Sequence, residues 1–556
     1  MSEENKKKGN LIAILTMFAL YAMVGFVTFL AAPAGDVWKY KLPGGSNVLG
    51  MLGNSMNFIA YLIMGYPAGK FLQKIGYKKT ALLATGSGAL GVLVQILSGK
   101  LEASMGLIGA VPAAWIIYLV GALISGFSNC LLNTVICPML NQIVGGGNKG
   151  NQLNLGGSAF NSLCGASAPI ILGSIVGQIT KETQFSQITG VLMAAAIVFI
   201  VATAIIAVLP IPNPTSRPST VVLERSALSF RHCRLGVIGI FLYMGIEIGT
   251  QNYMRLWLQP DNETTPLLAE SVLSKGVANN EKLSGVDGAA ARIADVIAAS
   301  RLAGKAAEGS SPEEAARVKA DFDKQAELEK SLVAKLTKKE SEGGLGIELG
   351  EDQAKKIAVA SIILPKGDNR EEFVAQAARS IKQSAVIAAS TAATFMVLML
   401  FGRLLGALIG GKVSSRAMCL FCAGTGVLFC SLGALLGATM ENTLISLPLF
   451  KSVTEIGMVP LPVGALFFIL AGLSASVMWG VIFNLATEGL GKYTEQAAGL
   501  FMVMVVGGAI LPSFQAWIAD KFGFMTSYVV PIFCFAYLFI YALAFSKNVN
   551  KDIKVD

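Results

Sequence analysis

The stretch LIAILTMFALYAMVGFVTFLAAPAG, residues 11–35, contains no charged side chain. A helix needs about 20 predominantly apolar residues to cross the hydrocarbon core of a bilayer, so this stretch is long enough to do so. Similar stretches recur along the chain and predict an all-α protein with twelve transmembrane helices. We expect them within residues 9–35, 42–69, 80–99, 103–148, 150–180, 183–216, 235–257, 383–410, 417–440, 456–487, 496–519 and 522–546.

The composition also indicates an integral membrane protein. Of the 556 residues, 53% are hydrophobic and 14% are charged, whereas soluble domains average about 25% charged residues. The net charge of +9 comes from dispersed Lys and Arg without a basic stripe, which argues against a nucleic-acid partner. The eight Cys lie mainly in apolar runs, and no group of Cys and His has the spacing of a metal site. We therefore expect no metal, no cofactor and no enzymatic activity, with the lipid bilayer as the surroundings.

Basic residues in the short loops predict the orientation. If the helices simply alternate, Lys and Arg concentrate on one side, in clusters that include 6–8, 70–79 and 217–234. Short loops rich in Lys and Arg stay in the cytoplasm. We therefore expect both termini to be cytoplasmic and the protein to lie in a bacterial inner membrane.

Residues 261–385 interrupt the apolar pattern. They hold 21 acidic and 18 basic residues, a net charge of −3, and their aromatic residues are Phe322 and Phe373. Runs of helix-forming residues, with Pro312 at a first turn, predict a small helical domain. By alternation it lies outside the cytoplasm, between the seventh and eighth spans. It is either a solvated insertion without chemistry of its own or a module that binds a protein partner.

The spans divide into two related halves. The loop from Gly69 to Lys79, after the second span, and the loop from Gly406 to Arg416, after the eighth, place small and basic residues at matching steps. Such a repeat indicates a duplicated transporter of six plus six helices. The expected parts are a first half, a cytoplasmic linker, helix seven, the insertion, and helices eight to twelve. Their ranges are 1–210, 211–234, 235–260, 261–385 and 386–556.

Five segments carry a family resemblance. They are PAGKFLQKIGYKK (67–79), GNQLNLGGSAFNSLCGASAP (150–169), FLYMGIEIG (241–249), FGRLLGALIG (401–410) and the segment 484–523. They resemble segments of the major facilitator superfamily, and within it of the fucose–glucose–galactose permease family of sugar/proton symporters. The resemblance implies twelve helices and sugar transport. That family's pattern has Asp in helix one and Glu in helix four, where this chain has Phe29 and Asn133. Coupling through that acidic pair, and fucose as the substrate, therefore do not follow from it.

Glu247 is the one acid that we expect well inside a span. An ionisable group at mid-membrane costs about 2.5–3.5 kcal/mol on insertion scales, so its presence suggests a function. We predict that Glu247 couples transport to H+, or to Na+ as a carboxylate ligand. The alternative is a structural Glu that is paired with a nearby Arg or Asn.

A neutral sugar needs amide and carboxylate groups for its hydroxyls and an aromatic face for its C–H surface. Gln251 lies one turn after Glu247 on the same helix face, and we expect Gln251 and Asn161 to be the best candidates. For each amide alone, a hydrogen bond between helices is an equal alternative. The mid-span residues that offer these groups are Asn57, Asn133, Asn161, Gln251, Trp479 and Asn484.

Other residues are expected to act in conformational gating near the cytoplasmic loops. Among them, Arg403 lies near the cytoplasmic end of helix eight, where its side chain can extend to the interface or pair. Arg255 is expected to be structural, and His232 to lie on the surface. The gating candidates are Gly69, Lys78, Lys79, Arg403 and Arg416.

The sequence thus predicts a secondary transporter that imports a hexose-like sugar by alternating access, with H+ or Na+ as the co-transported ion. The alternatives are an uncoupled facilitator, a carrier of another small polar metabolite, and a transporter-derived sensor or assembly protein.

Overall fold

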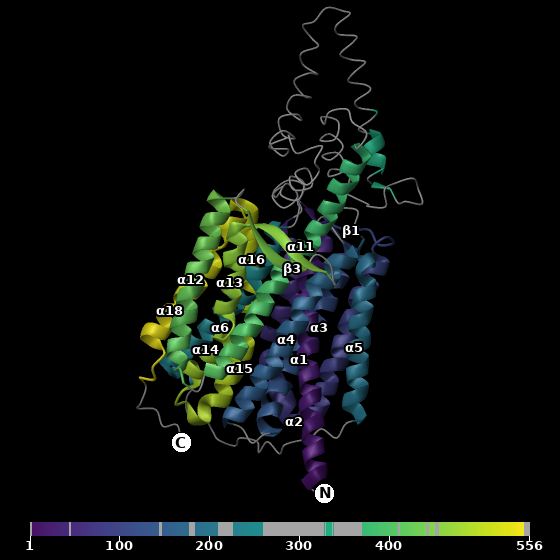
Figure 1. Ribbon diagram of the computed structural model, residues 1–556. Helices are drawn as coiled ribbons and strands as arrows, with labels where there is room; N and C mark the ends of the chain where they lie inside the picture. Colours follow the sequence, from purple (N-terminus) through teal and green to yellow (C-terminus); the bar gives the residue numbers. More distant parts are fainter. Residues whose placement is uncertain are drawn as a thin grey trace, which may run out of the picture.

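The chain folds into a bundle of long helices (Figure 1), seen here in a computed structural model. The N-terminus and the C-terminus lie at the same end of the bundle. Most of the predicted insertion, 261–385, lies outside the described residues. The structure describes residues 3–39, 41–43, 46–143, 147–176, 184–208, 226–258, 327, 330–335, 337–338, 370–409, 412–440, 444–450 and 455–549.

The helices pack as two groups. In the first group, α2 packs on α3 and α5, and α1 packs on α4; in the second, α6 packs on α14, α16 and α18. The two groups meet where α4 packs on α11 and where α2 packs on α15 and α16. The first group is α1 (Glu3–Lys39), α2 (Asn47–Leu101), α3 (Ala113–Ile143), α4 (Gly147–Val176), η2 (Phe185–Ile188) and α5 (Thr189–Val208). The second is η3 (Ala227–Ser229), α6 (Arg231–Leu258), α11 (Arg370–Ile409), α12 (Ser415–Thr439), α13 (Val463–Ala475), α14 (Met478–Thr487), η6 (Gly491–Tyr493), α15 (Thr494–Met504), α16 (Gly507–Phe522), α17 (Phe524–Ser527), α18 (Val529–Ile540) and the π-helical turn η7 (Tyr541–Phe545).

Eleven segments of the described chain are long and apolar enough to cross a membrane. Two of them lie in α2, which Gly76 interrupts with a φ of 81°, a conformation that glycine adopts without steric cost. The eleven correspond to all the predicted spans except the fifth, whose residues form α4. The first part of α4 is polar, GNKGNQLN, and α4 packs against α1 and α11 in the bundle.

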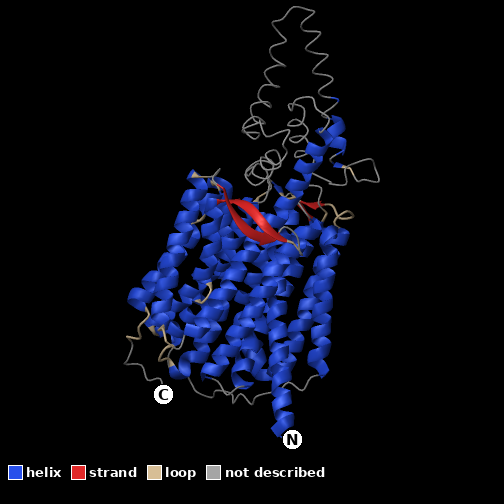
Figure 2. Ribbon diagram, in the orientation of Figure 1, coloured by secondary structure: helices blue, strands red, loops and turns tan. Residues whose placement is uncertain are grey.

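Two β-hairpins correct the all-α prediction. They lie at the end of the bundle away from the termini (Figure 2). The expectation that the tenth span starts at 456 is also wrong, because α13 starts at Val463. The preceding residues alternate as a strand does, with Val459 and Leu461 buried and Met458 exposed, and prolines there cannot donate helical hydrogen bonds. The hairpins pair β1 (Leu107–Ile108) with β2 (Val111–Pro112), and β3 (Leu444–Phe450) with β4 (Ile456–Pro462).

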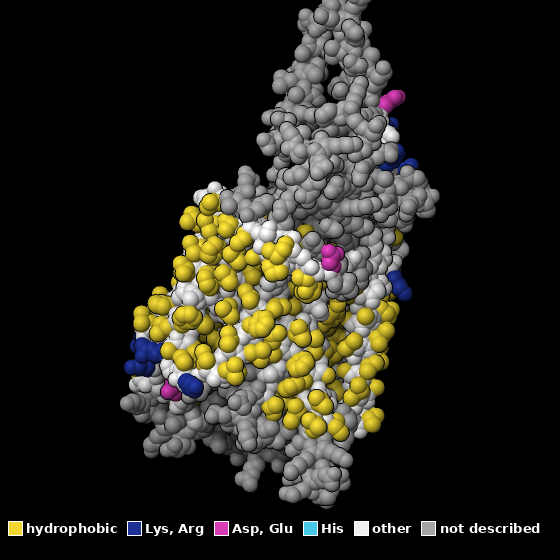
Figure 3. Space-filling view, viewed as in Figure 1, with side chains coloured by type: hydrophobic (Ala, Val, Ile, Leu, Met, Phe, Trp, Pro, Cys, Tyr) yellow, Lys and Arg dark blue, Asp and Glu magenta, His cyan; other side chains and the backbone are white. Residues whose placement is uncertain are grey.

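The outer surface of the bundle is apolar. Hydrophobic side chains cover the visible face of the helices, and Lys and Arg lie at its margins (Figure 3). On α5 alone, Ile197 and Val201 are about half exposed and Val208 is 83% exposed. A soluble protein rarely exposes so much continuous apolar surface, so this surface faces lipid. The chain is a predominantly helical, multi-pass membrane protein.

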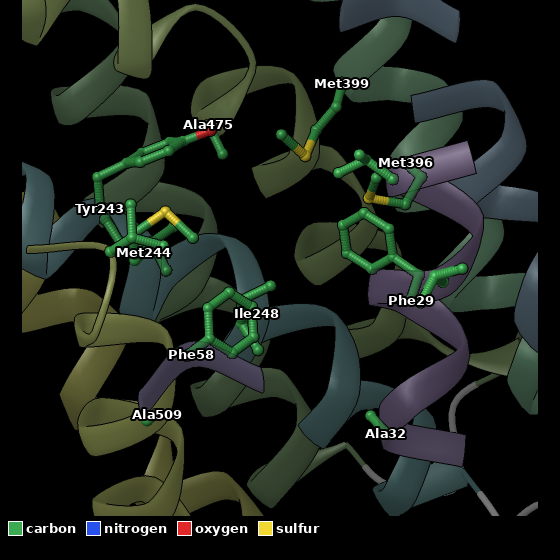
Figure 4. Packing of buried hydrophobic residues seen from close by; sticks show 14 of the residues in the cluster. Phe29, Ala32, Phe58, Tyr243, Met244, Ile248, Met396, Met399, Ala475 and Ala509 are labelled. Carbon is green, nitrogen blue, oxygen red and sulfur yellow. The ribbon is translucent and has the colours of Figure 1, made fainter. Parts of the chain in front are cut away.

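Both groups contribute side chains to the buried centre of the bundle. Phe29 of α1 and Phe58 of α2 belong to the same apolar cluster as Ile248 of α6 and Met396 of α11 (Figure 4). The candidate site lies beside this cluster, where α4, α6 and α11 approach one another.

Candidate substrate and ion site

An ion pair is buried at the junction of the two groups. Glu247 lies in the middle of α6, and the Nη2 of Arg403, on α11, is 3.2 Å from its Oε1. The two side chains are 11% and 9% exposed. The desolvation of two such charges is expensive unless their remaining polar atoms also find partners. The Arg403 guanidinium does find them.

Arg403 joins the second group to the first. Its Nη1 donates to the Ser158 carbonyl oxygen at 3.0 Å and to the Ser162 Oγ at 2.5 Å, and both serines lie on α4. Its Nε donates to the Ser476 carbonyl oxygen at 3.3 Å. The sequence prediction left two alternatives for Arg403, extension to the interface or pairing, and the structure shows pairing: the side chain is buried among four partners.

A break in the tenth predicted span supplies one of these acceptors. α13 ends at Ala475 and α14 begins at Met478. Because carbonyls at a helix end lack partners in the next turn, the Ser476 oxygen is able to accept the hydrogen bond from Arg403. Two serine residues of α4 and one helix break therefore hold the guanidinium in place.

One aromatic side chain adjoins the ion pair, and a second packs against the first. Tyr243 lies one turn before Glu247 on α6 and is fully buried. Its hydroxyl lies close enough to Glu247 and Arg403 to interact with both charges, yet it forms no hydrogen bond of normal geometry with a described residue. The Tyr243 ring centroid is 6.2 Å from that of Trp479 on α14. Tyr243 is absent from the sequence prediction, although its spacing of four residues from Glu247 was the signal that could have found it.

The predicted amides are divided between the junction and other places. Asn161 lies on α4 between the two serines that bind Arg403, and its Nδ2 donates to the Tyr21 carbonyl oxygen at 3.2 Å. Gln251 is buried near Glu247, and its Nε2 donates to the backbone oxygen of Glu247 at 3.1 Å. The structure thus places Asn161, Gln251 and Trp479 near the ion pair.

The other three amides lie elsewhere. Asn133 Nδ2 donates to the Tyr61 hydroxyl at 2.7 Å. Asn57 lines a small cavity inside the first group together with Gln95, and its Oδ1 has no hydrogen-bond partner among the described residues. Asn484 is exposed on α14.

The remaining gating candidates lie near the end of the bundle that holds the termini. Lys78 Nζ donates to the Ala207 carbonyl oxygen at 2.8 Å, at the end of α5. Arg416 Nε donates to the Ala542 carbonyl oxygen at 2.8 Å, in η7. Lys79 is exposed, and the space beside Gly69 is open, so that a methyl group there would meet no atom within 4 Å.

A second buried ion pair lies near the end of α1, just after the predicted span 9–35. Asp36 of α1 is 3% exposed, and its Oδ2 is 2.5 Å from the Nη1 of Arg255 on α6. Because Asp36 lies close to Lys39 in the sequence, the charge pattern indicates a loop at this position. Arg255, which the sequence predicts to be structural, is the partner of this carboxylate.

His232 is also misplaced by the sequence prediction. It is buried, not on the surface, and its Nε2 lies 3.0 Å from the Glu488 carbonyl oxygen. No group of three His, Cys, Asp or Glu in the described part of the chain is arranged to hold a metal ion.

Comparison with known proteins finds similarity to transporters. No protein-family model matches the chain. Over 85 residues it is 42% identical to the glucose/galactose transporter of Brucella abortus biovar 1 (strain 9-941), a match that covers 15% of this chain and 21% of that protein. The chain is thus aligned with about a fifth of the length of that curated relative.

The fold is that of a solved transporter. A crystal structure of the E. coli fucose:proton symporter aligns with a TM-score of 0.53 and 15% identity, over 97% of this chain and 100% of that one. A second structure of that symporter, described as a major facilitator superfamily transporter in the outward conformation, gives a TM-score of 0.52 and 16% identity over the same shares of the two chains. The chain therefore has the fold of this major facilitator superfamily transporter, and 85 of its residues are similar in sequence to a glucose/galactose transporter.

Proposed function

We propose that this chain imports a hexose-like sugar across the bacterial inner membrane by alternating access, as a symporter. The buried Glu247–Arg403 pair carries the proposal, because it lies where the two groups of helices meet and its cation also binds α4. The sequence relative is a glucose/galactose transporter, and the solved structure of like fold is a fucose:proton symporter. Both support a sugar as the substrate class.

The proposed architecture has twelve spans, with α4 as the fifth. The first six would form one half, residues 1–210. Helix seven and helices eight to twelve would form the other, on either side of the insertion at 261–385. Both termini would be cytoplasmic, as the basic loops predict. In this arrangement the two halves rock about a site at mid-membrane.

The proposed sugar site lies beside the ion pair. The Trp479 ring offers a face for the C–H surface of a sugar, and the Tyr243 hydroxyl, beside both charges, forms no hydrogen bond of normal geometry with a described residue. Asn161 and Gln251 donate to backbone atoms, so that their carbonyl oxygens are the groups available for sugar hydroxyls. Asn57, Asn133 and Asn484 remain candidates from the sequence that lie further from the pair.

Glu247 would couple transport to the ion through Arg403. A proton and the guanidinium compete for the same carboxylate. When Glu247 takes up a proton, Arg403 loses its anion and keeps the oxygen acceptors of α4 and Ser476. The strength of the link between α4 and α11 would thus depend on the proton, which is how an ion can bias one conformation over another.

The pairing favours H+ over Na+ as the coupling ion. A Na+ ion at Glu247 would lie beside the guanidinium, and two cations that share one carboxylate repel each other. A proton instead forms a covalent O–H bond and removes the negative charge.

Uptake by the full-length protein in proteoliposomes tests the proposal. Labelled glucose, galactose, fucose, mannose and N-acetylglucosamine would be offered under an imposed pH gradient or Na+ gradient. We expect at least one hexose to accumulate, driven by the pH gradient. Uptake without any gradient dependence would instead indicate a facilitator, and sugar binding without flux would indicate a sensor. No binding and no flux for any sugar would overturn the proposal.

A matched pair of variants tests the coupling residue. Glu247→Gln should abolish accumulation against a gradient while sugar exchange continues. The control is Glu102→Gln, which removes a carboxylate that pairs with Lys41 inside the first group and should leave accumulation unchanged. Normal accumulation by Glu247→Gln would show that the coupling residue lies elsewhere.

A further inference from the structure

Asp520, near the end of α16, reaches across the junction to the start of α2. Its Oδ2 accepts a hydrogen bond from the Ser46 Oγ at 3.0 Å, and its Oδ1 accepts from the Asn47 Nδ2 at 2.5 Å and from the Asn47 backbone N–H at 3.3 Å. α2 begins at Asn47, so these donors lie at its N-terminus. The carboxylate comes from the second group and the donors from the first.

This contact occupies the place of a helix cap. The first N–H groups of a helix lack acceptors within the helix, and a side chain at the preceding residue usually satisfies one of them. Ser46 is that residue in α2, but its side chain forms no capping bond; its hydroxyl donates to Asp520 instead. The carboxylate is also favoured by the positive end of the helix dipole. The cap of α2 is therefore supplied by the opposite group of helices.

A second link lies at the same end of the bundle. Asp36 lies near the end of α1 and Arg255 near the end of α6, both away from the termini, and they pair in the buried interior. Two carboxylates, one from each group, thus hold this end closed. The Asp520 contact differs from the Asp36–Arg255 pair, because the donors to Asp520 are neutral backbone and side-chain groups at a helix start, whereas the donor to Asp36 is a charged guanidinium.

We infer that Asp520 is a gate residue: it caps α2 across the junction, and the end of the bundle away from the termini opens only when α2 loses this cap. The inference rests on the proposed alternating access. Opening would expose the N–H groups at the start of α2 to water, so the free energy of capping favours the closed state. Asp520 is thus a positioning residue for the transport cycle and has no contact with the proposed sugar site.

Distances between spin labels on the full-length protein in lipid nanodiscs test the inference. One label pair replaces Leu97 on α2 and Leu435 on α12, two exposed positions near the gate. A second pair replaces Leu83 and Phe421 on the same two helices, exposed and near the termini. The native cysteines are first replaced. A rocking motion would lengthen one distance while it shortens the other.

Asp520→Asn and Asp520→Ala should increase the ratio of gate-open to gate-closed molecules about fivefold, as expected for the loss of a typical cap. Glu102→Gln, which removes a carboxylate that pairs within the first group, should leave both distances unchanged. Asp520 variants that melt at a lower temperature but keep both wild-type distance distributions would show a merely structural cap and overturn the inference. If the wild-type distances respond to neither sugar nor pH and no uptake occurs, the proposed function itself fails, and the gate fails with it.

Discussion

Arg403 and Glu247 lie 156 positions apart in the chain and yet neutralise each other. Removing one partner leaves the other as an uncompensated buried charge, which costs about 3–5 kcal/mol. Glu247→Ala and Arg403→Ala should therefore each lower the melting temperature of the detergent-solubilised protein. The double variant Glu247→Gln/Arg403→Gln should lose less stability than the sum of the corresponding single variants, since neither side chain is then charged. Additive losses would show that the two charges do not interact.

Tyr243 allows a test of substrate binding without a change in packing. Its hydroxyl lies beside the charges of Glu247 and Arg403 but forms no hydrogen bond of normal geometry with a described residue, so Tyr243→Phe should lower the melting temperature less than Glu247→Ala does and should raise the apparent KM for the sugar. The control is Tyr528→Phe. The Tyr528 hydroxyl donates to the Thr250 carbonyl oxygen at 3.0 Å, and its loss should cost about 1 kcal/mol of stability without a change in KM. An unchanged KM for Tyr243→Phe would remove that residue from the sugar site.

Individual residues show which features of the site the sequence predicts and which it does not. The apolar context of Glu247 was enough to predict a buried acid, because composition alone marks a span. Its partner was not predictable, since hydrophobicity gives no information on which helices face each other. Asp36 was missed for a related reason: it is close to basic residues in sequence, whereas its partner Arg255 belongs to another helix.

Close approach between helices depends on glycine at a few positions. A Cβ on Gly507 of α16 would overlap the backbone oxygen of Phe241 on α6, whereas a Cβ on Gly86 of α2 would meet no atom within 4 Å. Gly507→Ala should therefore destabilise the protein, because a backbone atom cannot rotate away. Gly86→Ala should be neutral or stabilising by up to about 1 kcal/mol, since alanine favours the helical conformation. Thermal melting of the two variants compares them directly, and equal melting temperatures would argue against close packing of α6 on α16.

At the scale of elements, apolar length predicted helices well and strands poorly. The residues of β4 are apolar enough to be taken for the first turns of a membrane helix. Only the position of the prolines and the alternation of buried and exposed residues distinguish this strand from a helix. α4 shows the converse case: it is a long helix with a polar first part, and it is not among the eleven apolar segments of the described chain. α4 packs against α1 and α11 in the bundle, and the sequence does not indicate these neighbours.

At the scale of the whole molecule, engineered disulfides can test whether the two groups of helices move against each other. The Oγ atoms of Ser55 and Ser513 lie 2.9 Å apart across the junction. In a background without other cysteines, the pair Ser55→Cys/Ser513→Cys should stop uptake when oxidised and restore it when reduced. The matched pair Thr425→Cys/Ser474→Cys joins α12 to α13 within the second group, where the hydroxyls are also 2.9 Å apart. Its oxidation should leave uptake intact, and inhibition by both pairs would contradict motion between groups.

Lys78 lies in the loop after the second predicted span and Arg416 in the loop after the eighth, and each binds a carbonyl oxygen at the end of the last helix in its own group. A cation at a helix C-terminus is favoured by the helix dipole. Each group therefore has a basic side chain that binds its own last helix, and neither contact involves the other group. In evolutionary terms, a half whose stabilising contacts lie within itself can be duplicated, or inherited as a separate gene, without losing its internal packing. The two copies are then free to diverge where they face each other, which is where Arg403, Asp520 and their partners now lie.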